Sequence, residues 1–542
     1  MKILGISCAH DSNICVVEDG EVLVHVEKER ITRIRYDVGS LEEHVPRILA
    51  SIGLTIDDID YVATSVPVWN DLPTTGKMSG GEYTDSIGWG KGEIEICGRK
   101  IPAWQMAHHL GHIATAYYLS PFDNADVLSI DGGGNYTFGL LCKASGNKIE
   151  TIADLKDQNL GWLWNALAGR IFGAMSAAGK VMGLAPYGSP KYVADLYGEF
   201  GLDKDGVKYL YMKEFPDHTR PIPFSKIGYK EQAGVLTKEE EDMSYSLQEV
   251  TDRMAVSMLE KLIDNGSRSE NLCLSGGVAL NCVMNEVIRK TGMYRRIYVP
   301  SAPNDSGLSI GFALYLWHNI LNNPRKTKTH WHPYRGMPHA EKEKIEAVEK
   351  AKEQGLKVKH LKTENEQNKA VVDLLIAQKI VGIHRGRSES GPRALGHRSI
   401  VADPRNPEMK DIINAKVKFR EAFRPFAPSV LIEETQKYLD FDGYSPYMSF
   451  APVCKPEAKE KMAATIHVDG SARLQTADPY NNPDFYNLIK TFYDATGVPV
   501  LLNTSLNTKG EPINEIPMHS LDTLLKSELD ALLIDDYLFT KE

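Results

Sequence analysis

"VLSIDGGGNYTFGLLCKASGNKIETI", residues 127–152, contains a complete unit of supersecondary structure. Its first apolar run is typical of a buried strand, and the three glycines after Asp131 indicate a tight turn. The remainder of the stretch predicts two more strands that are joined by a second turn. A strand, a loop and a hairpin are therefore expected to follow one another here.

The same order of elements is predicted at the start of the chain. "KILGIS" (residues 2–7) predicts a strand, and "ICVVEDGEVLVHVEKER" (residues 14–30) contains two apolar runs on either side of an Asp-Gly pair. An Asp-Gly pair between two such runs is a strong hairpin signal. Helices are expected at residues 108–120, 161–178, 246–264 and 279–291. Sheets with helices between them indicate the α/β fold class.

The length of the chain indicates more than one domain. At 542 residues it exceeds the usual size of a single hydrophobic core. Residues 322–338 contain prolines and basic residues without apolar periodicity, which is typical of a domain edge. We therefore expect two domains, residues 1–335 and residues 336–542, of which the second is a separate α/β unit.

Composition excludes several classes of partner. Hydrophobic residues make up 42% of the chain and charged residues 25%, as in ordinary globular proteins. The formal charge of −10 argues against nucleic acids and anionic membranes as partners and favours small ligands. The seven cysteines never occur as C-x-x-C, and we find neither a signal peptide nor a long apolar segment. A reducing, cytoplasmic location is therefore expected.

"MAHHLGHIATAYYL" (residues 106–119) places three histidines in an apolar helical pattern. His108 and His112 are four residues apart, so their rings project from one face of a helix, whereas His109 points elsewhere. Two imidazoles on one face are able to share a metal ion. The alternative is a mere packing role, because an isolated H-x-x-x-H pattern requires only two coincidences.

Two aspartates complete a candidate metal site. Asp131 ends a predicted strand, and Asp305 in "APNDSG" directly precedes a predicted helix. Small residues flank both carboxylates and leave room for a ligand. Together with the two histidines they form a nitrogen and oxygen donor set that suits Fe(II), Zn(II) or Mn(II) better than Ca(II) or Cu(I).

Two glycine-rich segments are candidate phosphate sites. In "LCLSGGVALNCVMN" (residues 272–285) Gly276 and Gly277 permit close approach of the backbone to a ligand, ahead of a helix N-terminus. An ordinary tight turn between a strand and a helix explains the same residues equally well. In "AAGKVMGLAPYG" (residues 177–188) Lys180 is able to contact a phosphate, unless the segment is only a connection.

The second domain contains two basic segments. "GIHRGRSESGPRALGHRS" (residues 382–399) carries four arginines, and "NAKVKFREAFRPF" (residues 414–426) carries two lysines and two arginines. In a net-acidic chain this concentration of charge indicates a localised anion site, because guanidinium groups match phosphate oxygens in bidentate geometry. A solvated basic face is the alternative.

The motifs, taken in order, resemble a known family. They are "AHDSN", "EKERITR", "HHLGH", "DGGG", "GKVMGLAPYG", "LSGGVALN", "PNDSG", "GRSESGPRALGHRSI", "FREAFRPFAPSV", "HVDGSARLQT" and "NTSLNTKGEPI". This set resembles the O-carbamoyltransferases of antibiotic and nodulation-factor biosynthesis, the NodU/CmcH family, over essentially the whole chain. The resemblance implies an N-terminal domain of the ASKHA (actin/hexokinase-like) superfold and a C-terminal YrdC-like domain.

The resemblance also implies a role for each motif. The metal, usually iron, would be held by His108, His112, Asp131 and Asp305, while His10 would orient or deprotonate the acceptor hydroxyl and Asp11 would contact the acceptor. The implied nucleotide-binding residues are Gly132, Gly133, Lys180, Gly276, Gly277 and Asn281. The implied carbamoyl phosphate and ATP site of the second domain comprises Arg387, Arg393, Arg398, Lys416, Lys418, Arg420, Arg473, Ser505 and Asn507.

The reaction implied by this resemblance has two halves. Carbamoyl phosphate and ATP, with Mg²⁺ as an optional ion, would form carbamoyl-adenylate in the second domain, and the first domain would transfer the carbamoyl group to a hydroxyl of a small molecule. A tRNA threonylcarbamoyl-type transferase and an ASKHA sugar kinase are the alternatives. Residues 66–100 contain no motif, and we expect either a lid over the acceptor or a surface excursion there.

Overall fold

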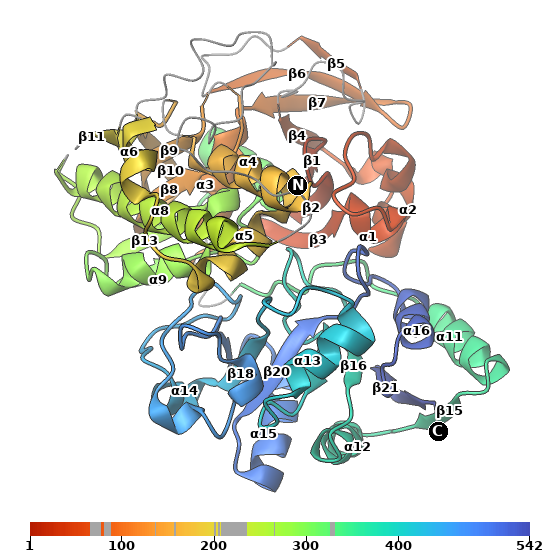
Figure 1. Ribbon diagram of the computed structural model, residues 1–542. Coiled ribbons are helices and arrows are strands. Elements are labelled where there is room, and N and C mark those ends of the chain that lie inside the picture. The colour runs from red at the N-terminus through yellow and green to blue at the C-terminus, as the bar shows by residue number, and fades with distance from the viewer. Residues whose placement is uncertain are drawn as a thin grey trace.

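The computed structural model describes residues 1–65, 77–80, 88–135, 137–156, 159–199, 202–203, 206–207, 236–264, 266–325 and 331–541. Two α/β parts lie one above the other in Figure 1. The first part carries two large sheets, and the second carries one sheet of eight strands. The α/β class predicted from the sequence is confirmed.

The first sheet begins with the predicted strand and hairpin. Its strand order is β3-β2-β1-β4-β7-β6-β5. The strands are β1 (Lys2–Ser7), β2 (Asn13–Glu18), β3 (Glu21–Glu27), β4 (Tyr61–Ser65), β5 (Lys77–Gly80), β6 (Trp89–Ile96) and β7 (Arg99–Met106). Asp19 and Gly20 have φ angles of 49° and 85°, as the tight turn of this hairpin requires.

The second sheet repeats the arrangement of the first. It consists of β8 (Asn124–Ile130), β9 (Gly139–Ser145), β10 (Lys148–Asp154), β13 (Asn271–Ser275) and β14 (Arg296–Tyr298), in the order β10-β9-β8-β13-β14. As β1 does in the first sheet, β8 pairs antiparallel with the strand that follows it and parallel with a strand much later in the chain. The repetition predicted from the sequence is therefore present, and it agrees with the two-halved superfold that the resemblance implies.

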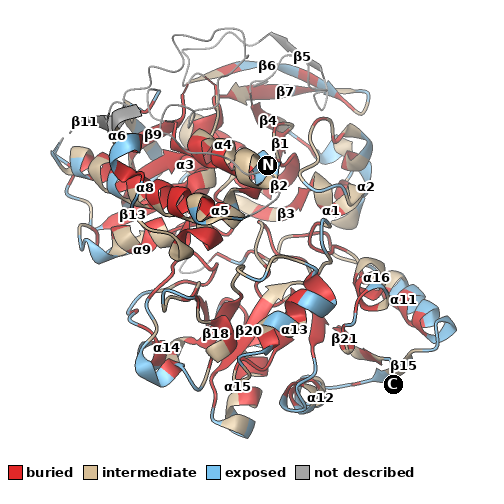
Figure 2. Cartoon of the chain, viewed as in Figure 1, coloured by how far each residue is buried: buried red, intermediate tan, exposed pale blue. Residues whose placement is uncertain are grey.

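Two buried helices lie between these sheets. Helix α3 (His108–Leu119) contacts β8, β9 and β13, and helix α10 (Leu308–Tyr315) contacts β1, β2 and β4. The two helices cross closely, because a Cβ atom on Gly311 would lie 1.9 Å from the carbonyl oxygen of Gly111. Every residue of α3 is buried, including its three histidines. Figure 2 shows α3 in red.

Other helices cover the second sheet. They are α4 (Leu160–Phe172), α5 (Ala178–Leu184), α6 (Val193–Glu199), α8 (Lys238–Asp264) and α9 (Cys282–Lys290), with the short turn η3 (Met175–Ala177) after α4. The helix predicted at residues 161–178 is interrupted at Gly173, whose φ is 68°. Helix α8 begins at Lys238, earlier than predicted, because three glutamates in its first turn favour a helix N-terminus without adding apolar periodicity.

The third sheet organises the second part. Its order is β15-β22-β21-β16-β17-β20-β18-β19. The strands are β15 (Lys357–His360), β16 (Val381–His384), β17 (Arg398–Ala402), β18 (Ala427–Leu431), β19 (Gln475–Ala477), β20 (Val500–Ser505), β21 (Ala531–Ile534) and β22 (Tyr537–Thr540). The main helices are α11 (Glu341–Glu353), α12 (Glu364–Ile376), α13 (Met409–Ile413), α15 (Pro483–Thr496) and α16 (Pro517–Lys526).

The two parts share an extensive interface. One cluster of buried apolar residues extends from Leu128 in the second sheet to Val401 in the third. Near the predicted boundary, the carbonyl oxygen of Arg335 accepts a hydrogen bond of 2.7 Å from the backbone of His25 in β3. The boundary at residue 335 itself stays a prediction.

Two further expectations concern the first part and the whole chain. Most of the candidate lid, residues 66–76 and 81–87, lies outside the described residues, while residues 77–80 and 88–100 contribute strands to the edge of the first sheet. Among the described residues, none of the helices combines the length and the apolar character needed to cross a membrane.

Candidate functional site

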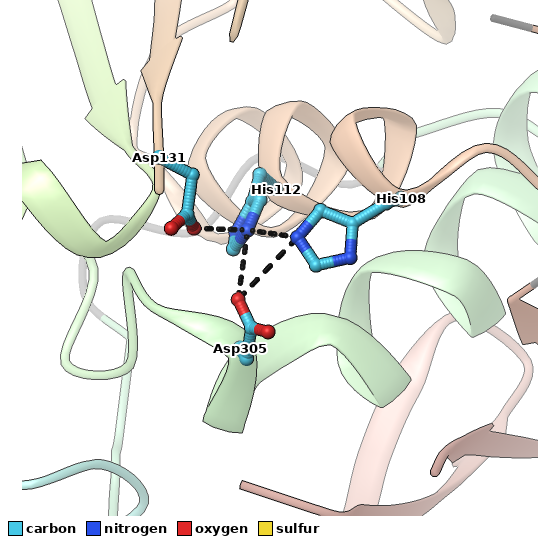
Figure 3. Close-up of side chains that lie close together, drawn as sticks. All are labelled: His108, His112, Asp131 and Asp305. Carbon is cyan, nitrogen blue, oxygen red and sulfur yellow. Dashed lines mark hydrogen bonds and ion pairs between the residues drawn. The ribbon is translucent and has the colours of Figure 1, made fainter. Parts of the chain in front are cut away.

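Four side chains converge at the centre of the first part (Figure 3). Nε2 of His112 lies 3.0 Å from Nε2 of His108, 2.9 Å from Oδ2 of Asp131 and 3.3 Å from Oδ1 of Asp305. Nε2 of His108 lies 3.4 Å from the same Asp305 oxygen. One ligand atom from each residue lies within 4.8 Å of the other three. We call these four residues the His/Asp quartet.

Three separate elements position the quartet. Both histidines come from consecutive turns of α3, Asp131 directly follows β8, and Asp305 begins the short turn η7 (Asp305–Gly307) before α10. The backbone amide of Gly277 donates a hydrogen bond of 2.9 Å to Oδ2 of Asp131. Helix α3, the end of β8 and the turn before α10 therefore bring the quartet together from positions far apart in the sequence.

Gly276 and Gly277 lie against the end of β8 and against Asp131. Gly276 has a φ of 82°, and a Cβ atom there would lie 2.1 Å from the carbonyl oxygen of Ile130. A Cβ on Gly277 would lie 3.2 Å from Oδ1 of Asp131. This turn therefore needs glycine in order to approach the strand that carries Asp131.

His109 faces away from the quartet. Its Nε2 lies 3.1 Å from the carbonyl oxygen of Thr137, and its Nδ1 lies 2.9 Å from the hydroxyl of Ser129. Since a carbonyl only accepts, Nε2 carries the proton and the serine donates to Nδ1. Burial holds the pKa of His109 well below its usual range, so this ring is neutral.

The charges of the quartet support one another. Burial lowers the pKa of His112, but Asp131 and Asp305 outweigh burial and raise that pKa to about 9. Burial opposes ionisation of Asp305, yet His108 and His112 hold its pKa well below the usual range. Two imidazole nitrogens and two carboxylate oxygens around one centre are a donor set that fits a borderline divalent ion.

His10 and Asp11 lie beside the quartet. Nδ1 of His10 is 3.2 Å from Oδ1 of Asp11, whose other oxygen accepts a hydrogen bond of 2.7 Å from Asn304, the residue before Asp305. Burial lowers the pKa of His10, but Asp11 outweighs burial and, with Asp305 and Asp131, raises that pKa to about 9. Asp11 has a φ of 56°, a costly conformation that occurs at functional sites.

The other predicted nucleotide-binding residues have varied surroundings. A Cβ on Gly161 of α4 would lie 2.3 Å from the backbone nitrogen of Gly132, so this loop packs directly on a helix start, while Gly133 faces open space. The side chain of Asn281 caps α9 and donates to Gln248. Nζ of Lys180 lies 2.7 Å from Oε1 of Glu421 in the second part.

A group of cations lies on the second part where it faces the first. Burial, together with the nearby Arg473 and Arg424, lowers the pKa of Arg393 to about 9. Arg420 lies near the same two arginines. Nε of Arg473 is buried and has no hydrogen-bond partner among the described residues. Buried guanidinium groups that face one another favour a bound anion.

Lys418 lies beside these arginines and holds Ser505 and Asn507 in place. Its Nζ lies 2.5 Å from the carbonyl oxygen of Ser505 and 2.6 Å from Oδ1 of Asn507. Burial, together with the neighbouring Arg420 and Arg424, holds the pKa of Lys418 well below its usual range. We call Arg393, Lys418, Arg420, Arg424 and Arg473 the basic cluster.

Three predicted cations are engaged elsewhere. Arg387 donates to the carbonyl oxygens of Leu23, Arg335 and Gly336. Arg398 is fully buried and donates to the carbonyl oxygens of Arg385, Gly386, His397 and Glu515. Lys416 lies half exposed, 3.5 Å from Glu528. The structure therefore gathers only part of the predicted set around the basic cluster.

Arg35 and Tyr36 join the two sites, although sequence analysis did not select them. The Tyr36 ring stacks on His10 with centroids 5.3 Å apart, and its hydroxyl accepts a hydrogen bond of 2.7 Å from Arg35. Burial is the main cause of the lowered pKa values of Lys418 and Arg424, and Arg35 is close enough to contribute to both shifts. The preceding motif "EKERITR" is the only sequence signal near them.

Comparison with known proteins identifies the family. Models described as the carbamoyltransferase N-terminus and C-terminus match residues 2–71 and 93–314, and residues 372–541. Nodulation protein NolNO of Sinorhizobium fredii is 32% identical over 98% of this chain and 79% of that protein. Nodulation protein U of the same organism is 29% identical over 94% of both chains. The chain is an enzyme and belongs to the carbamoyltransferase family.

Two solved structures show weaker likeness. HypF of T. kodakarensis has 14% identity and a TM-score of 0.29, with 59% of this chain and 48% of that chain covered. Xylulose kinase from Rhodospirillum rubrum has 16% identity and a TM-score of 0.22, with 43% of this chain and 46% of that chain covered.

Proposed function

We propose that this carbamoyltransferase uses ATP and carbamoyl phosphate to carbamoylate a hydroxyl of a small molecule through carbamoyl-adenylate. The observation that supports the proposal most is the pair of charged sites, the His/Asp quartet and the basic cluster, on facing parts of one chain. Tyr36 lies between them, because its ring stacks on His10 and it is also close to Arg393. Burial lowers the pKa of Arg393, and Tyr36 partly offsets this effect.

The first half-reaction belongs to the basic cluster. Carbamoyl phosphate is hydrolysed to carbamate and phosphate, and a carbamate oxygen then attacks the α-phosphorus of ATP while pyrophosphate leaves. Arg393, Arg424 and Arg473 neutralise the phosphate oxygens and hold the two substrates next to each other.

The second half-reaction belongs to the quartet and to His10. The quartet would hold a divalent ion, which we propose to be Fe(II), with Zn(II) and Mn(II) as alternatives; such an ion supplies Lewis-acid stabilisation when bound. His10 accepts the proton of the acceptor hydroxyl, the hydroxyl oxygen attacks the carbamoyl carbon, and AMP leaves. Burial lowers the pKa of His10 and Asp11 does most to raise it, while Asp305 and Asp131 add smaller contributions. An ion that neutralises these last two carboxylates therefore favours the neutral imidazole that accepts a proton.

A small cavity lies beside the basic cluster, where the two parts of the chain meet. Arg393 lines this cavity together with Leu280, Ser301 and Met448, which come from both parts of the chain. The two parts therefore meet beside Arg393, which supports a shared intermediate rather than two independent reactions.

Pyrophosphate release tests the proposal. We expect pyrophosphate only when ATP and carbamoyl phosphate are both present, whereas a sugar kinase would form ADP without a carbamoyl donor. Arg473→Gln is expected to abolish the release, and Lys437→Ala, which changes a surface ion pair with Glu434, is the control. A screen of hydroxyl compounds for a mass gain of about 43 Da, one carbamoyl group in place of a proton, identifies the acceptor.

A further inference from the structure

Two side chains of the first part form hydrogen bonds with both backbone polar groups of Gly391 in the second part. Oε1 of Glu27 accepts a hydrogen bond of 2.7 Å from the amide of Gly391, and Nη2 of Arg30 donates one of 2.7 Å to its carbonyl oxygen. Glu27 and Arg30 also form an ion pair of 3.1 Å with each other. Only 5% of Glu27 and 2% of Arg30 is exposed. We call this arrangement the Gly391 clamp.

Gly391 has no freedom to move within the clamp. Its φ is 104°, and a Cβ atom there would lie 2.1 Å from the carbonyl oxygen of Ser301 in the first part. The loop that carries Gly391 therefore packs closely against the first part, between the Glu27–Arg30 ion pair and the backbone of Ser301. Arg393 of the basic cluster follows only two residues later.

A second carboxylate fixes the far end of the same loop. Oε1 of Glu389 accepts hydrogen bonds from the backbone amides of Leu395, His397 and Arg398. Arg393 lies between this anchor and the Gly391 clamp. The backbone on both sides of the arginine is thus held by buried, charge-assisted hydrogen bonds, which are about twice as strong as neutral ones.

Stability alone is a poor explanation for the clamp. Removing two charges from water is costly, and an apolar pair of similar size is often as stable. This buried ion pair instead fixes the position of one residue, because it hydrogen-bonds to both the amide and the carbonyl oxygen of Gly391. The motif "EKERITR", which contains both side chains, has no role in the two half-reactions described above.

We propose that Glu27 and Arg30 are positioning residues that act through Gly391 to hold Arg393 in the anion site of the second domain. The first domain thereby sets the geometry of a site that lies in its neighbour. This inference rests on the proposed function, in which Arg393 neutralises phosphate oxygens.

Kinetics of pyrophosphate release without an acceptor test this role. Loss of the clamp leaves Arg393 present but misplaced, so for Arg30→Met we expect KM for carbamoyl phosphate to rise about tenfold, and kcat to change by less than about threefold. Arg30→Lys keeps the charge and should recover part of the loss. Glu27→Gln, which keeps the shape of the side chain, is the second variant if Arg30→Met does not fold.

A double-mutant cycle identifies the path of the effect. If Arg30 acts through Arg393, then Arg30→Met should raise KM by less than about twofold in an Arg393→Lys background. Arg289→Met is the matched control, because Arg289 forms an interdomain ion pair of 2.9 Å with Asp442 and belongs to α9 rather than to the segment that contacts Gly391. It should leave KM unchanged.

The possible failures are distinguishable. If the wild type releases no pyrophosphate with both substrates, the proposed function is wrong and the inference falls with it. If the wild type is active but folded Arg30→Met and Glu27→Gln keep its KM, the positioning role is overturned. Independent effects of Arg30→Met and Arg393→Lys on KM, or an equal effect of Arg289→Met, overturn it as well.

Discussion

Asp131 is held so that only part of its carboxylate remains for a ligand. The amides of Gly132 and Gly277 donate to its two oxygens, at 2.5 Å and 2.9 Å, and Nε2 of His112 lies 2.9 Å from Oδ2. Backbone donors fix the orientation of the carboxylate before any ion binds. Such outer contacts commonly affect metal affinity almost as much as the ligands themselves do.

Loss of one quartet ligand is expected to abolish metal binding. His112→Ala removes the residue that contacts the other three, so we expect affinity for Fe(II), Zn(II) and Mn(II) to fall at least about 100-fold. Titration calorimetry and elemental analysis of the purified protein measure this. His109→Gln is the control, because His109 lies on the same helix but faces Ser129 and Thr137. Equal metal content in both variants would argue against the quartet as the site.

The residue types of the quartet were predictable, but the use of each cation was not. A helical spacing of four residues correctly places His108 and His112 on one face, and the four chosen side chains do converge. The role of Arg398 could not be predicted from the sequence, because a guanidinium that donates to backbone carbonyl oxygens is the same group as one that binds phosphate. Burial between β16 and β20 decides this, and burial is a property of the fold.

At the scale of elements, the glycine turn after β13 does more than connect a strand to a helix. Gly276 adopts a left-handed conformation in contact with Ile130, so this turn and the end of β8 are packed against each other. The amide of the next residue then reaches Asp131. A local turn thereby supports the position of a candidate metal ligand.

Gly276→Ala should disturb both stability and the metal site. The new Cβ would overlap a backbone carbonyl and strain a positive φ, so we expect a loss of about 2–4 kcal/mol in the free energy of unfolding and weaker metal binding. Urea unfolding and calorimetry measure the two effects. Gly133→Ala is the control, because no atom lies within 4 Å of its added Cβ. Wild-type stability in Gly276→Ala would contradict the packing argument.

Elements were predictable wherever the local pattern was strong. The hairpin at Asp19, the strand at residues 127–130 and the helix at residues 108–119 follow from periodicity and turn residues. The early start of α8 was missed because its first turn is acidic and carries no apolar signal. The order of strands in the third sheet depends on contacts between distant segments, which no local pattern contains.

At the scale of the whole molecule, the segment of residues 27–36, at the end of β3 and directly after it, joins the two parts. Arg33 donates to the carbonyl oxygens of Ile513 and Pro512 and to the side chain of Asn514, at 2.8, 2.9 and 2.9 Å. These acceptors follow closely after Ser505 and Asn507, which contact Lys418. The same segment therefore contacts the second part at the Gly391 clamp and close to Ser505 and Asn507, which contact Lys418 of the basic cluster.

Arg33→Ala is expected to loosen the interface without unfolding either sheet. Three part-buried hydrogen bonds are lost, each with a net contribution of about 0.5–1.5 kcal/mol, so the free energy of unfolding should fall by roughly 1.5–4.5 kcal/mol. Hydrogen exchange should quicken at residues 512–514 and 27–36, while strands such as β1 and β20 stay protected. Lys180→Ala is the comparison, since its partly exposed ion pair with Glu421 is worth at most about 1 kcal/mol. Equal losses in the two variants, or unchanged exchange in Arg33→Ala, would show that Arg33 does not hold the two parts together.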